Sequence, residues 1–279
     1  MEKGSFDLLG NIAIVKFQKG IKTSDKKLFA GKLMKENNSV KTVLEKIGKF
    51  KGRLRKQTTR YLSGQKNKEA IYHENGCVFR FNVDDTYFSP RLSNERKEIA
   101  LKIKKGDRIL VMFAGVAPFP IIIAKLSKAE EVYSNEINRK ANEYANLNIE
   151  LNKMKGRVIL LPGDIKKVAE KLSRRQAPAA FSGRKENRIQ NGIPRYFDVI
   201  AMPRPQLRDS FLKEAFSLSK KGTRIYYYDF CKEDEIDLVI DKVKNEAKKN
   251  RKKIKILNVK KAGNISPYRY RIRVDFRVL

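Results

Sequence analysis

The sequence predicts an α/β protein with a mostly parallel, seven-stranded sheet. From residue 107 onward, short apolar runs alternate with segments of helical period, which is typical of βαβ units with helices on both faces of the sheet. A glycine turn at Ala114 and Gly115 directly follows the first apolar run and precedes a helix that begins at Pro118. Strands are expected at 109–113, 131–134, 158–161, 196–202, 224–230, 253–259 and 268–278.

Helices are expected between these strands, and one more helix precedes the first of them. Ser93 or Asn94 would cap that first helix, because either side chain can accept a hydrogen bond from the first turn. The expected helices span 94–103, 118–126, 139–153, 165–173, 207–219 and 233–250.

The segment 174–195 breaks the alternation of strands and helices, since it is rich in Gly, Pro, Ala and charged residues and has no helical or strand period. Its five arginines favour a loop that faces RNA over one that is merely solvated.

The first 86 residues lack this alternation and predict a small α+β domain. Asn75 and Gly76 form a strong turn signal between two alternating runs, so a β-hairpin is expected around them. The chain is therefore divided into a domain of residues 1–86 and a domain of residues 87–279. The other elements expected in the first domain are a turn followed by a strand over 5–17, a lysine-rich helix over 26–35 and a strand at 42–47.

The composition indicates a polyanionic partner. The chain of 279 residues has 63 Lys and Arg against 31 Asp and Glu, a formal net charge of +32. A protein with this charge binds nucleic acid favourably, because binding releases counterions. The alternative explanation of the charge is that the proteins of the source organism are all rich in lysine. The segment 48–64 places Tyr61 among basic residues, which suits contact with phosphates and stacked bases, or equally a solvated hairpin edge.

Other classes of protein are disfavoured. The chain has no apolar run long enough to span a membrane and no signal-peptide core near its N-terminus, so we expect a cytoplasmic protein. Cys77 and Cys231 are too few for a disulfide framework or a zinc site, and the single histidine, His73, argues against a histidine-based metal site or catalytic triad. No metal is expected.

The turn after the first strand predicts a cofactor that contains a nucleoside. Its sequence, AGVAPF, offers one glycine, whereas a pyrophosphate cofactor requires G-x-G-x-x-G. Glu136 follows about twenty residues later, at the end of the next strand, where such folds bind ribose hydroxyls. Gly163 and Asp164 after the third strand suit adenine. S-adenosyl-L-methionine therefore fits better than a dinucleotide, and a seven-stranded sheet with an antiparallel closing strand is the plan of a class I (Rossmann-like) methyltransferase.

Several motifs resemble the archaeal and eukaryotic type of tRNA (guanine-37-N1)-methyltransferase. The block FSPRLSNER at 88–96, joined to MFAGVAPF at 112–119, is specific to this family and its close relatives. SFDLLGNIAIVKF, LPGD and the C-terminal YRIRVDFRVL extend the resemblance over residues 5–279. It does not include the small N-terminal domain with which the family grips the outer corner of tRNA.

The resemblance implies methyl transfer from S-adenosyl-L-methionine to N1 of guanosine-37, in the anticodon stem-loop of tRNA, by a monomeric enzyme. The family's general base falls on Glu95, and the arginine that stabilises O6 of the base falls on Arg55. Arg96 would help to position that site. The family's cofactor contacts fall on Phe113, Ala114, Gly115, Glu136 and Asp164.

Three positions depart from the family pattern. Val111 stands where the family usually has an acid, and Ala117 where it usually has a second glycine. The loop at 202–205, Met-Pro-Arg-Pro, lacks the asparagine that orients the base, and Arg204 would supply a donor in its place. The alternatives are a wyosine- or wybutosine-pathway enzyme on the same nucleotide (C7 methyl or aminocarboxypropyl transfer) and a catalytically degenerate RNA-binding homologue.

Overall fold

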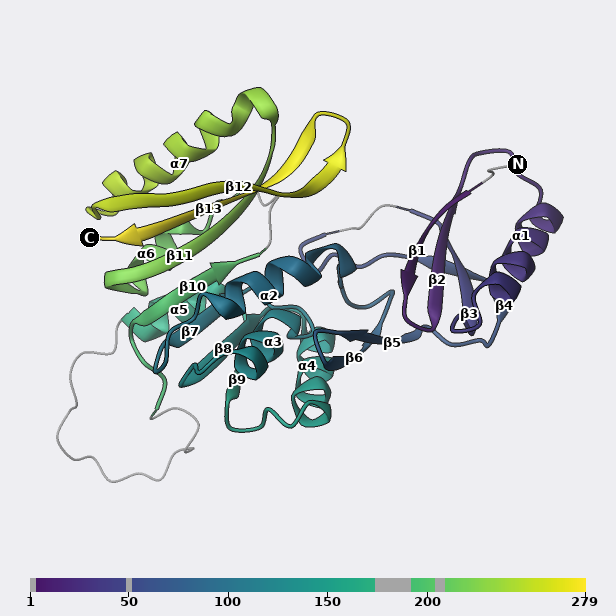
Figure 1. Ribbon diagram of the computed structural model, residues 1–279, viewed down its shortest axis with the longest axis horizontal. Coiled ribbons are helices and arrows are strands. Elements are labelled where there is room, and N and C mark those ends of the chain that lie inside the picture. Colours follow the sequence, from purple (N-terminus) through teal and green to yellow (C-terminus); the bar gives the residue numbers. More distant parts are fainter. Residues whose placement is uncertain (1–3, 49–51, 174–191, 204–208) are drawn as a thin grey trace.

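The computed structural model describes residues 4–48, 52–173, 192–203 and 209–279, and its larger unit contains the seven-stranded sheet that the sequence predicts (Figure 1). The strands are β7 (Arg108–Met112), β8 (Glu131–Glu136), β9 (Val158–Pro162), β10 (Phe197–Met202), β11 (Ser219–Lys232), β12 (Ile254–Ser266) and β13 (Arg269–Val278). Their order across the sheet is β12-β13-β11-β10-β7-β8-β9. The pairs among β7 to β11 are parallel, whereas β13 runs antiparallel to β11 and β12. The class I methyltransferase sheet is therefore confirmed.

Helices cover both faces of this sheet. They are α2 (Ser93–Leu101), α3 (Pro118–Leu126), α4 (Arg139–Leu151), α5 (Ile165–Ser173), α6 (Leu212–Ser217) and α7 (Ile236–Lys249). Because alternate residues of a strand point to opposite faces, Ile109 and Val111 pack with α2, α3 and α4, and Leu110 and Met112 pack with α5, α6 and α7. No helix in the described part of the chain is both long and apolar enough to cross a membrane.

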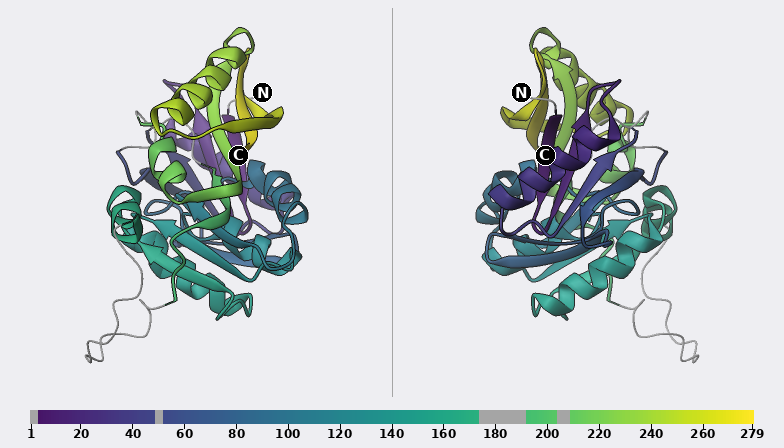
Figure 2. Two further views of the ribbon diagram at one scale, coloured as in Figure 1. Left: turned by 90° about the vertical axis from the view of Figure 1, so that its left-hand side faces the viewer. Right: turned by 90° about the vertical axis from the view of Figure 1, so that its right-hand side faces the viewer.

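The N-terminal unit is a four-stranded sheet with one helix packed on it. Its elements are β1 (Gly4–Leu9), β2 (Ile12–Phe17), α1 (Thr23–Glu36), β3 (Thr42–Lys46) and β4 (Thr59–Gly64). Figure 2 shows α1 against one face of this sheet, where Ala30 and Leu33 share a small core with Val15 and Val43. The helix and the strand predicted at 26–35 and 42–47 are both present.

The expectation of a turn followed by one strand over 5–17 is wrong, because β1 and β2 form a hairpin there. The hairpin turns at Gly10, which has a φ of 60°. A Cβ atom on Gly10 would lie 1.8 Å from the carbonyl oxygen of Ile71, so only glycine allows this approach of the backbone. A glycine between two apolar runs was the available signal.

Three further expectations need correction. The helix predicted over 207–219 is the short α6, and the strand predicted at 224–230 begins at Ser219 instead. Ser93 and Asn94 do not cap α2, because a 3-10 turn (Pro90–Leu92) leads into it and the Ser93 hydroxyl accepts a hydrogen bond from Asn75 instead. Most of the loop predicted at 174–195 lies outside the described residues.

The hairpin predicted around Asn75 and Gly76 is present as β5 (Glu69–Glu74) and β6 (Cys77–Asn82). It lies between the four-stranded sheet and α4 (Figure 1) and touches both units. Phe79 and Phe81 of β6 belong to the core under α3 and α4. The division of the chain after residue 86 stays a prediction.

Two buried asparagines of α4 bind the outer edge of β6 as another strand would. Asn152 accepts a hydrogen bond from the Val78 N–H group (2.9 Å) and donates one to the Val78 carbonyl (2.7 Å). Asn148 does the same with Arg80 (2.8 and 3.1 Å) and also donates to the carbonyl of Val116 (3.0 Å). These amides satisfy the backbone groups of a strand edge that would otherwise be buried without partners.

We expect Asn148→Ala to lower the free energy of unfolding by roughly 2–4 kcal/mol, because it leaves three buried backbone groups unpaired. Urea denaturation measures the change. The control is Asn146→Ala, which alters an exposed side chain of the same helix. Equal effects of the two substitutions would contradict the role given to Asn148.

Candidate active site

The candidate site begins at the turn that connects β7 to α3. Phe113, Gly115 and Ala117 all have positive φ angles, of 59°, 59° and 65°, so the chain reverses within a few residues. A Cβ atom on Gly115 would lie 3.3 Å from the carbonyl oxygen of Tyr87, tighter than an ordinary contact. Ala117 takes up a left-handed conformation that costs a residue other than glycine roughly 1–2 kcal/mol.

Glu136, at the end of β8, binds this turn. Its carboxylate, 6% exposed, accepts hydrogen bonds from the backbone N–H groups of Gly115 (2.9 Å) and Asn138 (2.8 Å). Asn138 also caps α4, since its side chain accepts from the N–H groups of Lys140 and Ala141. A carboxylate held at this edge of the sheet can accept hydrogen bonds from both hydroxyl groups of a ribose.

Asp164 follows β9, the third strand along the chain. Its carboxylate accepts a hydrogen bond from Arg53 (2.7 Å), a residue of the N-terminal basic segment. Burial alone would raise the pKa of Asp164, but the hydrogen bonds from Arg53 and the Lys166 N–H group, with the charges of both residues, together hold that pKa below its usual value. Asp164, Phe113 and Asn135 line a small hollow beside the turn, where a flat heterocycle could lie.

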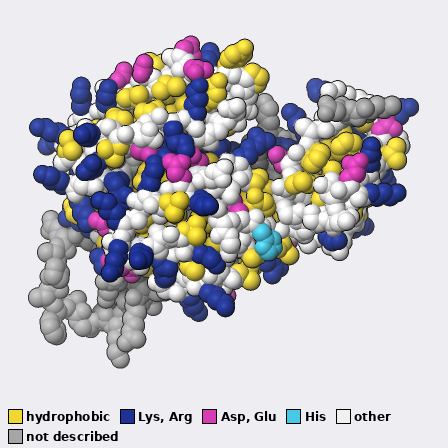
Figure 3. Space-filling model, viewed as in Figure 1, with side chains coloured by type: hydrophobic (Ala, Val, Ile, Leu, Met, Phe, Trp, Pro, Cys, Tyr) yellow, Lys and Arg dark blue, Asp and Glu magenta, His cyan; other side chains and the backbone are white. Residues whose placement is uncertain are grey.

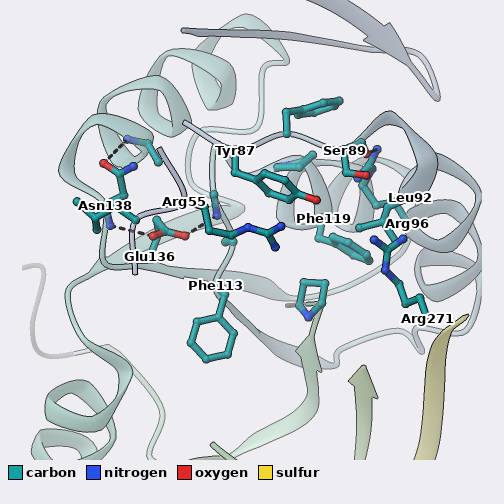
Figure 4. A pocket seen from close by; sticks show the side chains of 17 residues that line it. Arg55, Tyr87, Ser89, Leu92, Arg96, Phe113, Phe119, Glu136, Asn138 and Arg271 are labelled. Carbon is teal, nitrogen blue, oxygen red and sulfur yellow. Dashed lines mark hydrogen bonds between the residues drawn. The ribbon is translucent and has the colours of Figure 1, made fainter. Parts of the chain in front are cut away.

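A cavity opens over the turn between β7 and α3 (Figure 4). Its open volume, including the mouth, is about 690 Å³, within the range of small-molecule sites. Glu136 and Asn138 lie at one end in Figure 4, Arg96 and Arg271 lie at the other, and Arg55 lies between them. We call this the cofactor cavity.

Arg55 reaches the cofactor cavity from the N-terminal basic segment, so two distant segments meet at one site. Its guanidinium group stacks on the ring of Tyr87, 3.8 Å from the ring centre. Arg55 also has a positive φ angle of 51°, which is uncommon for a residue with a side chain. Lys and Arg side chains cover much of the face shown in Figure 3, consistent with the expected polyanionic partner.

Glu95 lies beside the cofactor cavity but is not among the residues that line it. Its buried carboxylate accepts hydrogen bonds from Arg273 (2.6 Å) and the Tyr228 hydroxyl (2.9 Å) and forms an ion pair with Lys260 (2.8 Å). Burial raises the pKa of Tyr228 well above its usual value, and the charge of Glu95 adds to that rise. The structure therefore assigns Glu95 a network that joins α2 to β11, β12 and β13.

Arg96, the next residue, does line the cofactor cavity. It forms a buried ion pair with Glu74 (2.6 Å) and donates to the Ser89 carbonyl (3.1 Å). Its guanidinium group also lies over the ring of Phe88. Arg96 thus fixes the FSPRL segment against the hairpin, as a positioning residue would.

Of the predicted site residues, Arg55, Arg96, Phe113, Ala114, Gly115 and Glu136 line one cavity. Asp164 lies in the adjoining hollow. Arg204 lies outside the described residues, although Pro203 just before it lines the cavity. No cluster of three or more His, Cys, Asp or Glu side chains with metal-binding geometry occurs in the described ranges.

The sequence interpretation missed Tyr87, Asn138 and Arg271, which also line the cofactor cavity. Asn138 could have been found, because Asn directly before a helical segment is a common cap. Tyr87 precedes the FSPRL block and could have been included with it. For Arg271 the sequence offered no signal, since it lies on the face of β13 opposite the apolar residues Ile272 and Val274.

The residues present fit S-adenosyl-L-methionine. Glu136 suits the ribose hydroxyls, the hollow at Asp164 and Asn135 suits adenine, and Phe113 lines both the hollow and the cofactor cavity. The single glycine of the turn leaves no cradle for a pyrophosphate.

Comparisons with known proteins agree with this geometry. The family model described as the TRM5/TYW2 methyltransferase domain matches residues 70–177. The chain is 32% identical to the tRNA (guanine(37)-N(1))/4-demethylwyosine(37)-methyltransferase Taw22 of Nanoarchaeum equitans, over 99% of this chain and 100% of that protein. The chain belongs to the TRM5/TYW2 family.

A second TRM5/TYW2 relative is the tRNA (guanine(37)-N(1))-methyltransferase Trm5b of Pyrococcus abyssi, 32% identical over 98% of this chain and 74% of the relative. The crystal structure of Trm5b from this organism superposes with a TM-score of 0.80 at 31% identity, covering 98% of this chain and 74% of that one. The resemblance predicted from FSPRLSNER and MFAGVAPF is confirmed, and S-adenosyl-L-methionine is the cofactor that the TRM5/TYW2 fold implies.

We expect Glu136→Ala to raise the dissociation constant for S-adenosyl-L-methionine roughly 10- to 100-fold, because a hydrogen bond to a charged group contributes about 1.5–3 kcal/mol. Isothermal titration calorimetry measures the constant. The control is Glu143→Ala, which removes a partly exposed carboxylate of α4 outside the cavity. An unchanged constant for Glu136→Ala would show that the cofactor binds elsewhere.

Proposed function

We propose that this chain transfers a methyl group from S-adenosyl-L-methionine to N1 of guanosine-37 in tRNA, the nucleotide 3′ of the anticodon. One observation carries the proposal: a single cavity has the carboxylate of Glu136 at one end and the guanidinium groups of Arg55 and Arg271 farther along. The two relatives that match nearly the whole chain have guanine-37 N1 methylation in their names. A monomeric enzyme is part of this proposal.

The chemistry needs a proton acceptor and a cation. N1 of guanine carries a proton at neutral pH, and negative charge develops at O6 as that proton leaves. When bound, S-adenosyl-L-methionine supplies an electrophilic methyl group. Arg55 would donate to O6, and its stacking on Tyr87 holds the guanidinium group in place before the base arrives.

Glu95 remains our proposed general base, by its position in the FSPRLSNER motif. Its carboxylate now binds Arg273, Tyr228 and Lys260, so it must turn from these partners toward the cavity to accept the N1 proton. Its neighbour Arg96 on α2 lines the cavity, so the helix that carries Glu95 borders the site. Arg204 lies outside the described residues and is proposed as a further donor to the base, because Pro203, its neighbour in the sequence, lines the cavity.

The direct test is mass spectrometry of nucleosides from unmodified tRNA incubated with the protein and S-adenosyl-L-methionine. We expect 1-methylguanosine, and only when guanosine occupies position 37. A cofactor-dependent product at another nucleotide, or none, would contradict the proposal; failure of the protein to bind the cofactor would favour a degenerate RNA-binding homologue.

A second candidate activity is methylation of 4-demethylwyosine at position 37. The observation in its favour is the similarity to Taw22, which extends over the whole length of that protein. The name of Taw22 includes methylation of both guanine-37 and 4-demethylwyosine-37. The same assay with tRNA that contains 4-demethylwyosine distinguishes one activity from two. Aminocarboxypropyl transfer would give a product with a larger mass increase.

We expect Glu95→Gln to lower the single-turnover rate of methylation by about 100-fold or more, the usual contribution of a general base. Affinity for the cofactor should stay unchanged, since Glu95 does not line the cofactor cavity. Rapid-quench kinetics across a pH series measures the rate.

Glu98→Gln is the matched control, because Glu98 shares both Arg273 and Lys260 with Glu95. It disturbs the same ion network without removing the proposed base. If both variants lose activity alike, Glu95 acts through the network and not as a base.

A further inference from the structure

Arg271 lies where two hollows of the molecule meet. It lines the cofactor cavity, and it also lines an open groove between the N-terminal sheet and the larger unit. We call this second hollow the entry groove; Lys16, Lys46 and Arg91 belong to its lining. Figure 4 shows Arg271 reaching from β13 toward the cofactor cavity, beside Arg96 and Phe119.

Arg271 is a buried cation that forms no ion pair with the described residues. It is 5% exposed, and its Nε atom is buried without a hydrogen-bond partner. Within the described ranges no carboxylate lies at ion-pair distance, and the one recorded contact of its guanidinium group is with the ring of Phe230, 5.4 Å from the ring centre.

The contrast with Arg273 shows that burial on this face of β13 does not exclude pairing. Arg273 stands two residues later on the same face, and it binds Glu95, Glu98 and Asp275. Both arginines are buried, yet only Arg273 forms ion pairs with carboxylates of the described residues. An unpaired buried charge is costly, so its retention points to a ligand that supplies the acceptor.

The electrostatic surroundings of Arg271 also favour a ligand that supplies a hydrogen-bond acceptor to its guanidinium group. Burial holds the pKa of the Arg271 guanidinium group below its usual value. The like charge of Arg55 adds to this lowering, and the opposing effects of Tyr87, Tyr228 and Glu95 do not offset it. Arg55 and Arg271 thus repel each other across the wall common to both hollows. A group rich in electron pairs between them would relieve this repulsion.

The acceptor is more consistent with a base than with a phosphate. Lys16 and Arg91 are exposed on the entry groove, where an RNA backbone can run. Arg271, at 5% exposure, is reached only by a group that leaves the backbone and enters the cavity. A flat guanine fits that requirement, and arginine pairs well with its O6 and N7 atoms.

We propose that Arg271 is a substrate-binding residue that donates hydrogen bonds to O6 and N7 of the target guanine, from the N7 side of O6, while Arg55 donates to O6 from its N1 side. This inference rests on the proposed function. These bonds hold the base in the ground state, and they strengthen as the N1 proton leaves and negative charge develops on O6, so Arg271 contributes both to binding of the base and to the rate of the chemical step.

The test compares Arg271→Met with the wild type under single-turnover conditions at saturating RNA and cofactor. We expect the methylation rate to fall roughly 100-fold, the usual effect of losing a donor to a developing oxyanion. The unfolding temperature should stay the same or rise, because an apolar side chain replaces an unpaired buried charge. The control is Arg277→Met, on the same strand but exposed, which should leave the rate unchanged.

Two results would overturn the proposal. A lower unfolding temperature with a parallel loss of activity would mean that Arg271 is structural. A normal rate with weaker RNA affinity and a shallower salt dependence would mean that it binds a phosphate.

A binding measurement separates this inference from the proposed function. Wild type should bind an anticodon stem-loop with guanine at position 37 more tightly than one with an abasic site there, and Arg271→Met should lose most of that difference. If wild type forms no 1-methylguanosine but keeps this preference and the variant loses it, the methylation proposal fails and Arg271 remains a base contact. If wild type and variant discriminate equally, the inference fails.

Discussion

The carboxylate of Glu136 is the contact on which the rest of the site depends. It joins the ends of β7 and β8 by accepting hydrogen bonds from the backbone of Gly115 and of Asn138. Asn138 in turn begins α4, whose asparagines hold the hairpin β5–β6. One buried acid therefore fixes the glycine turn, the start of a helix and, through that helix, the segment that leads to the FSPRL block.

A second constraint is the closure of the cavity by segments far apart in the chain. Arg55 comes from the N-terminal basic segment and Arg271 from the closing strand. Arg53 of the same basic segment binds Asp164 at the hollow next to the turn. The N-terminal unit thus forms part of the wall of the cofactor site, and a base that enters between the two units meets arginines from both sides.

The sequence predicted the parallel sheet and the glycine turn well, because these depend on local apolar runs and on one backbone conformation. It could not predict the surroundings of β13. The alternation of Ile272 and Val274 correctly marked one core face, but it does not tell whether the other face is covered. Here Glu95 of α2 binds Arg273, and both Arg271 and Arg273 are buried on that face. The partners of Glu95 were hidden for the same reason, since Arg273 lies 178 positions away.

The central claim is that one cavity holds the cofactor ribose at Glu136 and the target guanine between Arg55 and Arg271. A crystal structure of the protein with S-adenosyl-L-homocysteine and an anticodon stem-loop tests it most directly. The account predicts both ribose hydroxyls on the Glu136 carboxylate and O6 of guanine-37 within hydrogen-bond distance of both guanidinium groups. A ribose bound away from Glu136, or a guanine that remains stacked in the RNA loop, would contradict it.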